Sequence, residues 1–434
     1  MPKVIDLFAG LGGIRLGFEQ AMMELGLTTE CVFSSEIKPY AIEAYQEFFG
    51  KRENIFGDIT TVNVEKDIPD FDFLLAGFPC QPFSSAGNRQ GFADTRGTMF
   101  FEIERILQEK IDSGSPAKGF LLENVEGLIT HNGGQTLNTI VEHLRALGYV
   151  VNYKLLDAQY FGLPQSRKRV YIVGTLDEKI DLEDFEMKNS NLKDVLECGL
   201  PTMDTEFTRR LLANYTIEEI VGKSIKDKRG GKNNIHSWDI DLKGATTTQE
   251  REFLDLLLKE RRKKHWAEKI GIKWMDGMPL TENQIREFYD VENLHELLTG
   301  LTEKGYLSYE HPKKQVLNEK GAAVRIADET LPKGYNIVAG KLSFEFSKIL
   351  DPKELAPTLV AMDVAKLGVV DNGGIRRLTI RECQRICGYP DDYKLDMIKE
   401  SEAFDLLGNT VCVPVIKEIA LRMGEYYIKK EGDR

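Results

Sequence analysis

The first 175 residues alternate between short apolar runs and amphipathic stretches, and this alternation constrains the fold more than any other feature. The apolar runs that predict strands lie at 3–8, 31–35, 73–76, 119–122, 149–156 and 170–173. Segments with helical spacing of apolar residues, such as 14–25 and 136–147, separate most of them. This order predicts an α/β fold with a doubly wound, mostly parallel sheet, and such sheets bind ligands at the carboxyl ends of their strands.

Residues suited to cofactor binding follow these strand ends. The first run leads into Ala9-Gly10-Leu11-Gly12-Gly13, where glycines allow backbone N–H groups to approach a nucleotide-type ligand. Glu36 follows the second strand and can accept hydrogen bonds from ribose hydroxyls, and Asp58 follows a further short strand. The third glycine of the dinucleotide fingerprint would fall at position 15, which is Arg15, and this argues against an NAD-dependent oxidoreductase.

A cysteine lies between two prolines in Gly77-Phe78-Pro79-Cys80-Gln81-Pro82-Phe83-Ser84, directly after a buried strand. The prolines fix φ and favour extended backbone before them, so Cys80 belongs to a stiff loop at the sheet edge. A thiol in such a place is a candidate nucleophile, because a thiolate reacts strongly once its pKa is lowered. The alternative is a buried structural cysteine. Glu123 follows the next strand and converges on the same edge.

Composition sets broad limits on the class of protein. A length of 434 residues with 42% apolar residues predicts two globular domains. The six cysteines are scattered, and only Cys383 and Cys387 lie close together without a second pair, so we expect no metal site and a reducing, intracellular setting. We expect no signal peptide, because the N-terminal apolar run is too short, and no other run reaches membrane-spanning length.

The charge distribution leaves the question of a nucleic-acid partner open at first. The formal net charge is −12, yet residues 223–273 contain 14 Lys and Arg against 8 Asp and Glu, which is a local charge of +6. Local fields, and not the total, decide whether a polyanion is attracted. The run Arg261-Arg262-Lys263-Lys264 in this segment is either a DNA contact or a solvated helix face.

The periodicity changes after about residue 180. Residues 181–191 are polar and predict a linker, and 224–234 predict an exposed basic loop. A helix is expected over 250–269, followed by two shorter helices over 281–288 and 293–302 and then a glycine turn and a strand. This pattern fits a helix-turn-helix with a wing, and it equally fits an ordinary helical hairpin.

Six ordered motifs resemble those of the DNA cytosine-5 methyltransferases. They are DLFAGLGG (6–13), GFPCQPFS (77–84), ENV (123–125), QSRKR (165–169), RECQRICGYP (381–390) and GNTVCVPV (408–415). The size resembles the bacterial restriction–modification members. The resemblance implies a Rossmann-like S-adenosylmethionine-dependent catalytic domain over 1–180, a smaller target-recognition domain over 181–400, and a C-terminal segment, 401–434, that returns to the catalytic domain.

The resemblance also implies residue roles. Cys80 would attack C6 of a flipped cytosine, Glu123 would bind and protonate N3, and Arg167 and Arg169 would hold the site's negative charges. S-adenosylmethionine, converted to S-adenosylhomocysteine, would be bound by Phe8, Gly10, Gly12, Glu36, Ile37, Asp58, Ile59, Pro79, Asn409 and Val411. DNA would be contacted by Gln81, Ser84, Arg96, Gln165, Thr358 and Leu359. Many relatives carry an aromatic residue at the position of Ile37, so one contact to the adenine differs here.

The implied partners are double-stranded DNA and a separately acting cognate restriction endonuclease. The implied setting is the nucleoid of a bacterial cytoplasm, with the protein as a monomer. One branch of the family performs the same chemistry on tRNA, but the large middle region argues against that substrate. A non-catalytic DNA-binding regulator is the rival from another class, and the joint presence of Cys80, Glu123 and Arg169 argues against it.

Overall fold

The computed structural model describes residues 1–79, 99–228, 230–317, 323–339 and 344–432, which form two compact units. Unit 1 comprises Met1–Glu197, Pro352–Ala365 and Leu378–Arg434, and unit 2 comprises Cys198–Asp351 and Lys366–Arg377. Unit 1 is therefore larger than the predicted catalytic segments, because it also takes 181–197, 352–365 and 378–400. The physical reason is burial: Leu182 belongs to a core cluster of unit 1, and Tyr393 stacks on Phe48 with ring centroids 4.4 Å apart.

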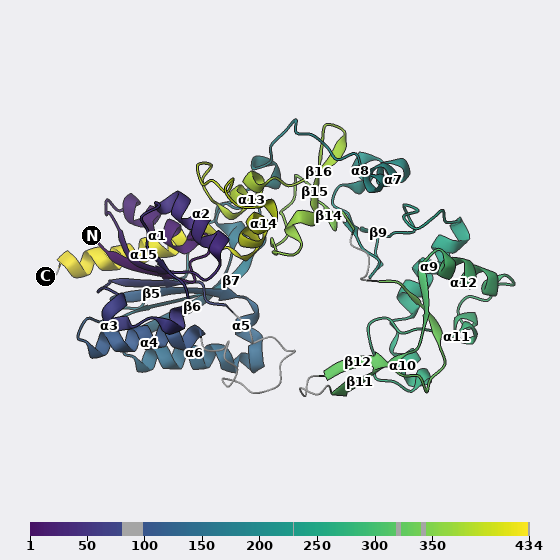
Figure 1. Cartoon of the computed structure of the whole chain (residues 1–434), viewed down its shortest axis with the longest axis horizontal. Coiled ribbons are helices and arrows are strands. Elements are labelled where there is room, and N and C mark those ends of the chain that lie inside the picture. The colour runs from purple at the N-terminus through teal and green to yellow at the C-terminus, as the bar shows by residue number, and fades with distance from the viewer. Residues whose placement is uncertain (80–98, 229, 318–322, 340–343, 433–434) are drawn as a thin grey trace. The chain divides into compact units, whose positions relative to one another are not determined.

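Unit 1 is built on a seven-stranded sheet with the order β3-β2-β1-β4-β5-β7-β6. The strands are β1 (Lys3–Leu7), β2 (Glu30–Ser35), β3 (Ile55–Phe56), β4 (Phe73–Ala76), β5 (Gly119–Val125), β6 (Val150–Asp157) and β7 (Lys168–Thr175). The pairs from β3 to β5 are parallel, and β7 runs antiparallel between β5 and β6. The prediction of a mostly parallel doubly wound sheet is confirmed (Figure 1).

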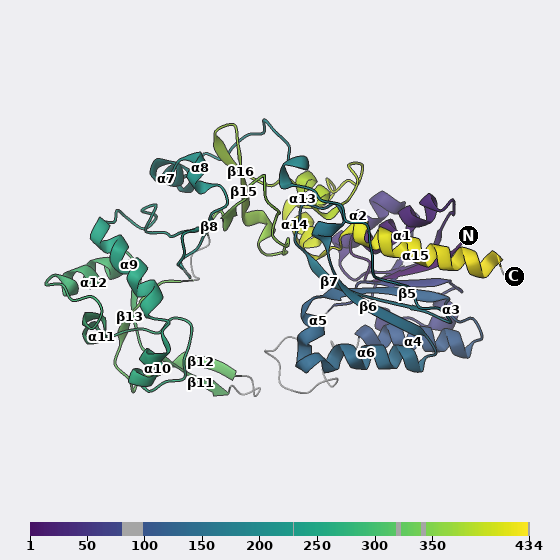
Figure 2. The same cartoon turned by 180° about the vertical axis from the view of Figure 1, so that it is seen from behind.

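Helices cover both faces of this sheet, as Figures 1 and 2 show. The described helices of unit 1 are α1 (Gly13–Glu24), α2 (Pro39–Phe49), α3 (Val64–Asp67), α4 (Met99–Asp112), α5 (Gly127–Thr130), α6 (Gln135–Ala146), α13 (Ile380–Cys387), α14 (Glu400–Asn409) and α15 (Val413–Gly432). One core cluster joins the strands to α4 and α6, and a second joins them to α1 and α15. The C-terminal helix, α15, therefore packs with α1 on the same face of the sheet.

Two hydrophobic clusters lie among the described residues of unit 2. Its elements are α7 (Glu206–Asn214), α8 (Ile217–Ile220), β8 (Ser224–Ile225), β9 (Asn234–Ile235), α9 (Thr248–Glu260), α10 (Lys264–Ile270), α11 (Glu282–Arg286), α12 (Leu294–Glu303), β10 (Leu307–Glu310), β11 (Lys313–Leu317), β12 (Ala323–Ala327), β13 (Gly334–Ile337), β14 (Lys348–Ile349), β15 (Leu367–Asp371) and β16 (Gly374–Arg377). The first cluster packs α7 and α8 on a sheet of order β16-β15-β14-β8-β9. The second lies among α9, α10, α11, α12, β10 and β13.

The second cluster has the order of a winged helix-turn-helix. Leu280 bridges Tyr335 of β13, β13 pairs antiparallel with β10, and α11 and α12 lie between Leu280 and β10 in sequence. The β11–β12 hairpin is inserted between β10 and β13 and occupies the place of the wing. Of the two interpretations of this region, the structure favours the helix-turn-helix with a wing.

The helix expected over 250–269 is instead two helices, α9 and α10. The break follows from Arg261, which is 3% exposed and donates from Nη1 to Asn336 Oδ1 at 2.6 Å. The carbonyl of Arg261 accepts from the backbone N–H of Met278 at 2.9 Å. In a continued helix, the same carbonyl would accept from an N–H of the helix itself.

Candidate active site

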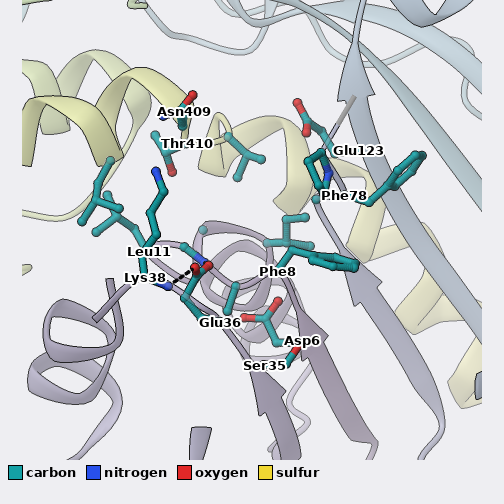
Figure 3. Close-up of a pocket in the computed structure, with 18 of the residues that line it drawn as sticks. Asp6, Phe8, Leu11, Ser35, Glu36, Lys38, Phe78, Glu123, Asn409 and Thr410 are labelled. Carbon is teal, nitrogen blue, oxygen red and sulfur yellow. Dashed lines mark hydrogen bonds between the residues drawn. The ribbon is translucent and has the colours of Figure 1, made fainter. Parts of the chain in front are cut away.

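A cavity of about 810 Å³ opens at the carboxyl ends of the unit 1 strands. Nine of the ten predicted cofactor residues line it: Phe8, Gly10, Glu36, Ile37, Asp58, Ile59, Pro79, Asn409 and Val411. Glu123, Arg167 and Arg169 line the same cavity. Figure 3 shows Glu123 and Phe78 on one side of it, and Lys38 and Glu36 on the other. Residues from distant parts of the sequence therefore meet in one space.

The turn after β1 holds left-handed backbone at three positions. The φ angles of Phe8, Gly10 and Gly12 are 56°, 54° and 66°. A Cβ on Gly10 would meet no atom within 4 Å, whereas one on Gly12 would lie 2.4 Å from the ring of Phe49. Gly12 therefore serves the turn and its packing on α2 rather than the cavity wall. Phe8 also has a positive φ, although residues other than glycine rarely adopt one. Backbone strain of this kind is typical of functional loops.

Arg15 explains why the third glycine of the dinucleotide fingerprint is absent. Its side chain is buried and lies over the Phe49 ring, with the guanidinium carbon 4.1 Å from the centroid. It donates to Glu19 at 2.6 Å, to Tyr45 at 3.0 Å and to Glu53 at 3.1 Å. The residue thus ties α1 to α2 and the segment after it, a structural role for a position outside the lining of the cavity.

The Glu36 carboxylate accepts hydrogen bonds from the backbone of both turns, the one after β1 and the one after β2. Oε2 accepts from the backbone N–H of Gly10 at 2.8 Å, and Oε1 accepts from those of Ile37 and Lys38 at 2.8 and 2.9 Å (Figure 3). These bonds fix the carboxylate between the β1 and β2 ends. It retains lone pairs that can accept from hydroxyl groups in the cavity.

Asp58 caps the turn that follows β3. Its Oδ1 accepts from the backbone N–H and the hydroxyl of Thr60 at 2.9 and 2.7 Å, and these bonds lower the pKa of the carboxyl. The group therefore stays ionised, and Oδ2 can accept from an exocyclic amino group.

The rim of the cavity carries a cluster that sequence reasoning missed. Asp405 Oδ2 accepts from Lys38 Nζ at 2.6 Å and from the Tyr40 hydroxyl at 2.7 Å, while Asn409 Nδ2 donates to Asp405 Oδ1 at 3.1 Å. This cluster orients the amide of Asn409, which we had predicted as a cofactor ligand. The available signal was the i,i+4 spacing of Asp405 and Asn409 on α14.

Glu123 and Arg169 form a buried ion pair at the opposite end. Arg169 Nε lies 3.0 Å from Glu123 Oε1, and the two side chains are 14% and 11% exposed. Burial raises the pKa of Glu123 despite the attraction of Arg169 and Arg167, and burial lowers the pKa of Arg169. Asn124 Nδ2 donates to Phe78 O at 3.0 Å and so fixes the chain just before Cys80. The pair can hold a proton and deliver it to a base nitrogen.

Arg167 has a different environment from the one expected. Its guanidinium is buried and donates to three backbone oxygens: Leu359 O at 2.7 Å, Gly408 O at 3.2 Å and Thr410 O at 2.5 Å. It lies within the electrostatic reach of Glu123 but makes its hydrogen bonds to the chain. Arg167 therefore acts as a positioning residue that holds three segments together.

Two of the predicted DNA contacts also have supporting roles in this structure. Gln165 and Leu359 are completely buried, and Gln165 bonds to the backbone of Leu359 at 3.1 Å and of Ile386 at 3.2 Å. Neither side chain has surface to offer DNA in this structure, which argues against these two predicted contacts. The Thr358 hydroxyl donates to Ser166 O at 2.7 Å. Cys80, Gln81, Ser84 and Arg96 lie outside the described residues.

Residues 2–425 match the family of C-5 cytosine-specific DNA methylases. The chain belongs to this family. It is 55% identical to the Type II methyltransferase M.NlaIV of Neisseria lactamica, over 97% of this chain and 98% of that protein. It is 42% identical to the Type II methyltransferase M.BanI of Aneurinibacillus aneurinilyticus, over 96% and 94% respectively.

Solved structures agree on the fold of this DNA methylase. The S. pombe Dnmt2 methyltransferase is 16% identical, with a TM-score of 0.53 and coverage of 99% of both chains. The chain is thus a DNA cytosine-5 methyltransferase by family and a Rossmann-like methyltransferase by fold. Within the described ranges, no helix is long and apolar enough to cross a membrane. The same residues contain no group of three or more His, Cys, Asp or Glu that could hold a metal ion.

Proposed function

We propose that this methyltransferase transfers a methyl group from S-adenosylmethionine to C5 of a cytosine that is flipped out of a specific double-stranded DNA sequence. The observation that carries the proposal is the single cavity that joins Phe8, Glu36 and Asp58 to the Glu123–Arg169 pair. One end suits an adenosine group and the other suits a pyrimidine. A methyl transfer needs both ligands in contact, and one shared cavity supplies that proximity.

The cavity residues fit the methyl donor chemically. Fixed acceptors at Glu36 and Asp58 suit two ribose hydroxyls and an exocyclic amine. The ring of Phe8 and the side chains of Ile37 and Ile59 offer flat and apolar surface for adenine. Asn409 and Val411 would close the pocket. When bound, this donor supplies an electrophilic methyl group.

Glu123 supports the chemistry on cytosine because burial raises its pKa. A raised pKa favours the protonated carboxyl, which can donate its proton to N3, and this makes C6 electrophilic. The thiolate of Cys80 then adds to C6, and C5 becomes an enamine carbon that attacks the methyl group. Arg169 holds the carboxylate that remains after the proton has moved.

The cycle closes by elimination. The C5 proton passes to a base or water, the Cys80–C6 bond breaks, and the N3 proton returns to Glu123. A stacked base cannot enter this cavity, so the cytosine must be flipped out, at a cost of about a few kcal/mol that contacts in the cavity offset.

The biological role follows from the relatives. M.NlaIV and M.BanI are Type II methyltransferases that align over nearly the whole chain, which supports a role in a Type II restriction–modification system of a bacterial cell. Such an enzyme would protect host DNA at the site of a separate endonuclease. Unit 2, which lies between the motif-bearing blocks in sequence, is proposed to recognise the target.

Trapping on 5-fluorocytosine tests the covalent step. DNA that carries this base at the target cannot lose its C5 substituent, so a denaturant-stable complex should accumulate when S-adenosylmethionine is present. Cys80→Ser should abolish the complex. Cys198→Ser is the matched control, because Cys198 is an exposed thiol of unit 2 and should trap like the wild type. A Cys80→Ser protein that still traps would refute the nucleophile.

Bisulfite sequencing of DNA from cells that express the protein identifies the modified base and its context. Exchange of unit 2, residues 198–351 and 366–377, for the corresponding segments of a relative with another specificity should then move methylation to the relative's site. An active exchange protein that still modifies the original sequence would exclude unit 2 as the recognition unit.

A further inference from the structure

The β11–β12 hairpin, hereafter the wing, is the most exposed regular element of unit 2. Its register pairs Lys313 with Ala327 and Gln315 with Arg325, and no wing residue belongs to the described hydrophobic clusters. Leu317 is 73% exposed and Ile326 is 46% exposed. A two-stranded hairpin of this kind is marginally stable alone and adds nothing to a core. Its residues are therefore available for a surface function.

A groove of about 400 Å³ lies at the base of the wing. We call it the basic groove; it is lined by Lys273, Trp274, Lys313, Lys314 and Arg325, with Asp328 as its acidic residue. Lys314 pairs with Asp328 at 3.1 Å. Lys273, Lys313 and Arg325 form no ion pair with any described residue. Three uncompensated cations in one concavity suit a polyanion.

The position of the side chains on the wing adds to this argument. In an antiparallel ladder, residues of one strand alternate between the two faces, so Lys313, Gln315 and Arg325 share a face. Arg and Gln are side chains that bind base edges as well as phosphates, and a two-stranded ribbon fits the major groove of DNA. Trp274, 42% exposed, presents its ring at the same groove.

The other two candidates for a DNA contact in unit 2 are less suitable. The exposed residues of α12 and its start include Glu292, Glu296 and Glu303, which would repel phosphates. The basic run 261–264 is largely engaged within the unit: Arg261 is buried, Arg262 pairs with Asp276, and Lys263 pairs with Glu260. Figure 1 shows the wing beside α10 and well separated from α12.

We propose that the wing and the basic groove at its base, rather than α12, are the parts of the winged helix-turn-helix that bind DNA, with Lys273, Lys313 and Arg325 on phosphates. The inference rests on the proposed function, because it assumes that the substrate is double-stranded DNA. It reverses the usual arrangement of a helix-turn-helix, in which the second helix enters the major groove.

The test compares two triple variants of the full-length protein. The wing variant is Lys273→Ala, Lys313→Ala and Arg325→Ala. The matched control is Lys232→Ala, Lys259→Ala and Lys264→Ala, which removes the same charge from exposed lysines of unit 2. Binding to a target duplex and to a random duplex is measured by fluorescence anisotropy over a range of salt concentrations, and thermal melts verify folding.

The wing variant should bind both duplexes about 10- to 100-fold more weakly at low salt, and its salt slope should fall by about 2–3, since each phosphate contact contributes about 0.9. The control should keep the slope of the wild type. A third variant, Glu296→Lys and Glu303→Lys, should also keep that slope. An unchanged slope for the wing variant, or a steeper slope for the α12 variant, would overturn the proposal.

The 5-fluorocytosine trap separates this proposal from the proposed function. The wing variant should still trap when the protein concentration exceeds its weakened dissociation constant, because its catalytic residues are intact. Failure of the wild type to trap would refute the reaction and leave the salt-slope comparison to be judged by itself.

Discussion

Replacement of Arg167 by methionine should destabilise unit 1 and weaken cofactor binding without removing catalysis. The guanidinium bonds to the backbone of Leu359, Gly408 and Thr410, which belong to two chain segments far from Arg167 in sequence. Gly408 and Thr410 line the cavity. Methionine fills most of the volume but donates nothing, so three buried carbonyls lose their partner.

The size of the effect follows from opposing contributions. Three hydrogen bonds from a charged donor contribute about 1.5 kcal/mol each at the low end, which gives a loss of about 4–5 kcal/mol. Removal of the buried charge offsets part of this, because Arg167 pays a desolvation penalty and its Nε has no hydrogen-bond partner among the described residues. We therefore expect a net loss of about 2–4 kcal/mol.

Urea unfolding measures the stability and calorimetry measures the affinity for S-adenosylmethionine. Arg145→Met is the control, because Arg145 is exposed and makes one long bond, 3.4 Å, to Val151 O. It should change the stability by less than about 0.5 kcal/mol. At saturating cofactor, Arg167→Met should trap 5-fluorocytosine DNA as the wild type does.

The opposite pattern would refute this reasoning. A variant with the stability and cofactor affinity of the wild type, but without methylation or trapping, would place Arg167 at the base. The role implied by the family resemblance would then be direct, and the three carbonyl contacts would be incidental.

Three further predictions concern the cavity carboxyls. Glu36→Ala should weaken S-adenosylmethionine binding by about 1–3 kcal/mol in calorimetry while DNA affinity without cofactor is retained; unchanged cofactor affinity would contradict the pocket. Glu123→Gln should slow methylation by about 10²–10⁴-fold, and the wild-type rate should fall as pH rises through the raised pKa of Glu123, a limb that the variant lacks. Burial raises the pKa of Asp6 to about 8, so the folded state stays protonated where the unfolded state is ionised. Stability should therefore fall by up to about 1.4 kcal/mol per pH unit from about pH 4 to 8, and urea unfolding of Asp6→Asn should show no such slope.

Features that depend on local sequence could be predicted, and the clearest case is the set of carboxyl side chains that line the cavity. Glu36 and Asp58 follow strands and Glu123 lies near the end of β5, and parallel strands bring their carboxyl ends to one edge whatever the rest of the chain does. The predicted domain boundaries were less accurate, because Leu182 and Tyr393 lie in segments whose local composition resembles a linker or a loop. Only their burial in unit 1 reveals where they belong.

Features set by long-range contacts could not be predicted, and Arg167 shows why. Its motif, QSRKR, indicates a basic segment near a charged site, and both a base contact and a structural contact satisfy that pattern. The difference lies in carbonyl groups 192, 241 and 243 residues away, and backbone carbonyls carry no signature in the sequence. The same argument applies to the basic run at 261–264. Four cations in a row predict a positive surface, but the burial of Arg261 depends on Asn336 in β13, so the positive surface lies instead at the wing.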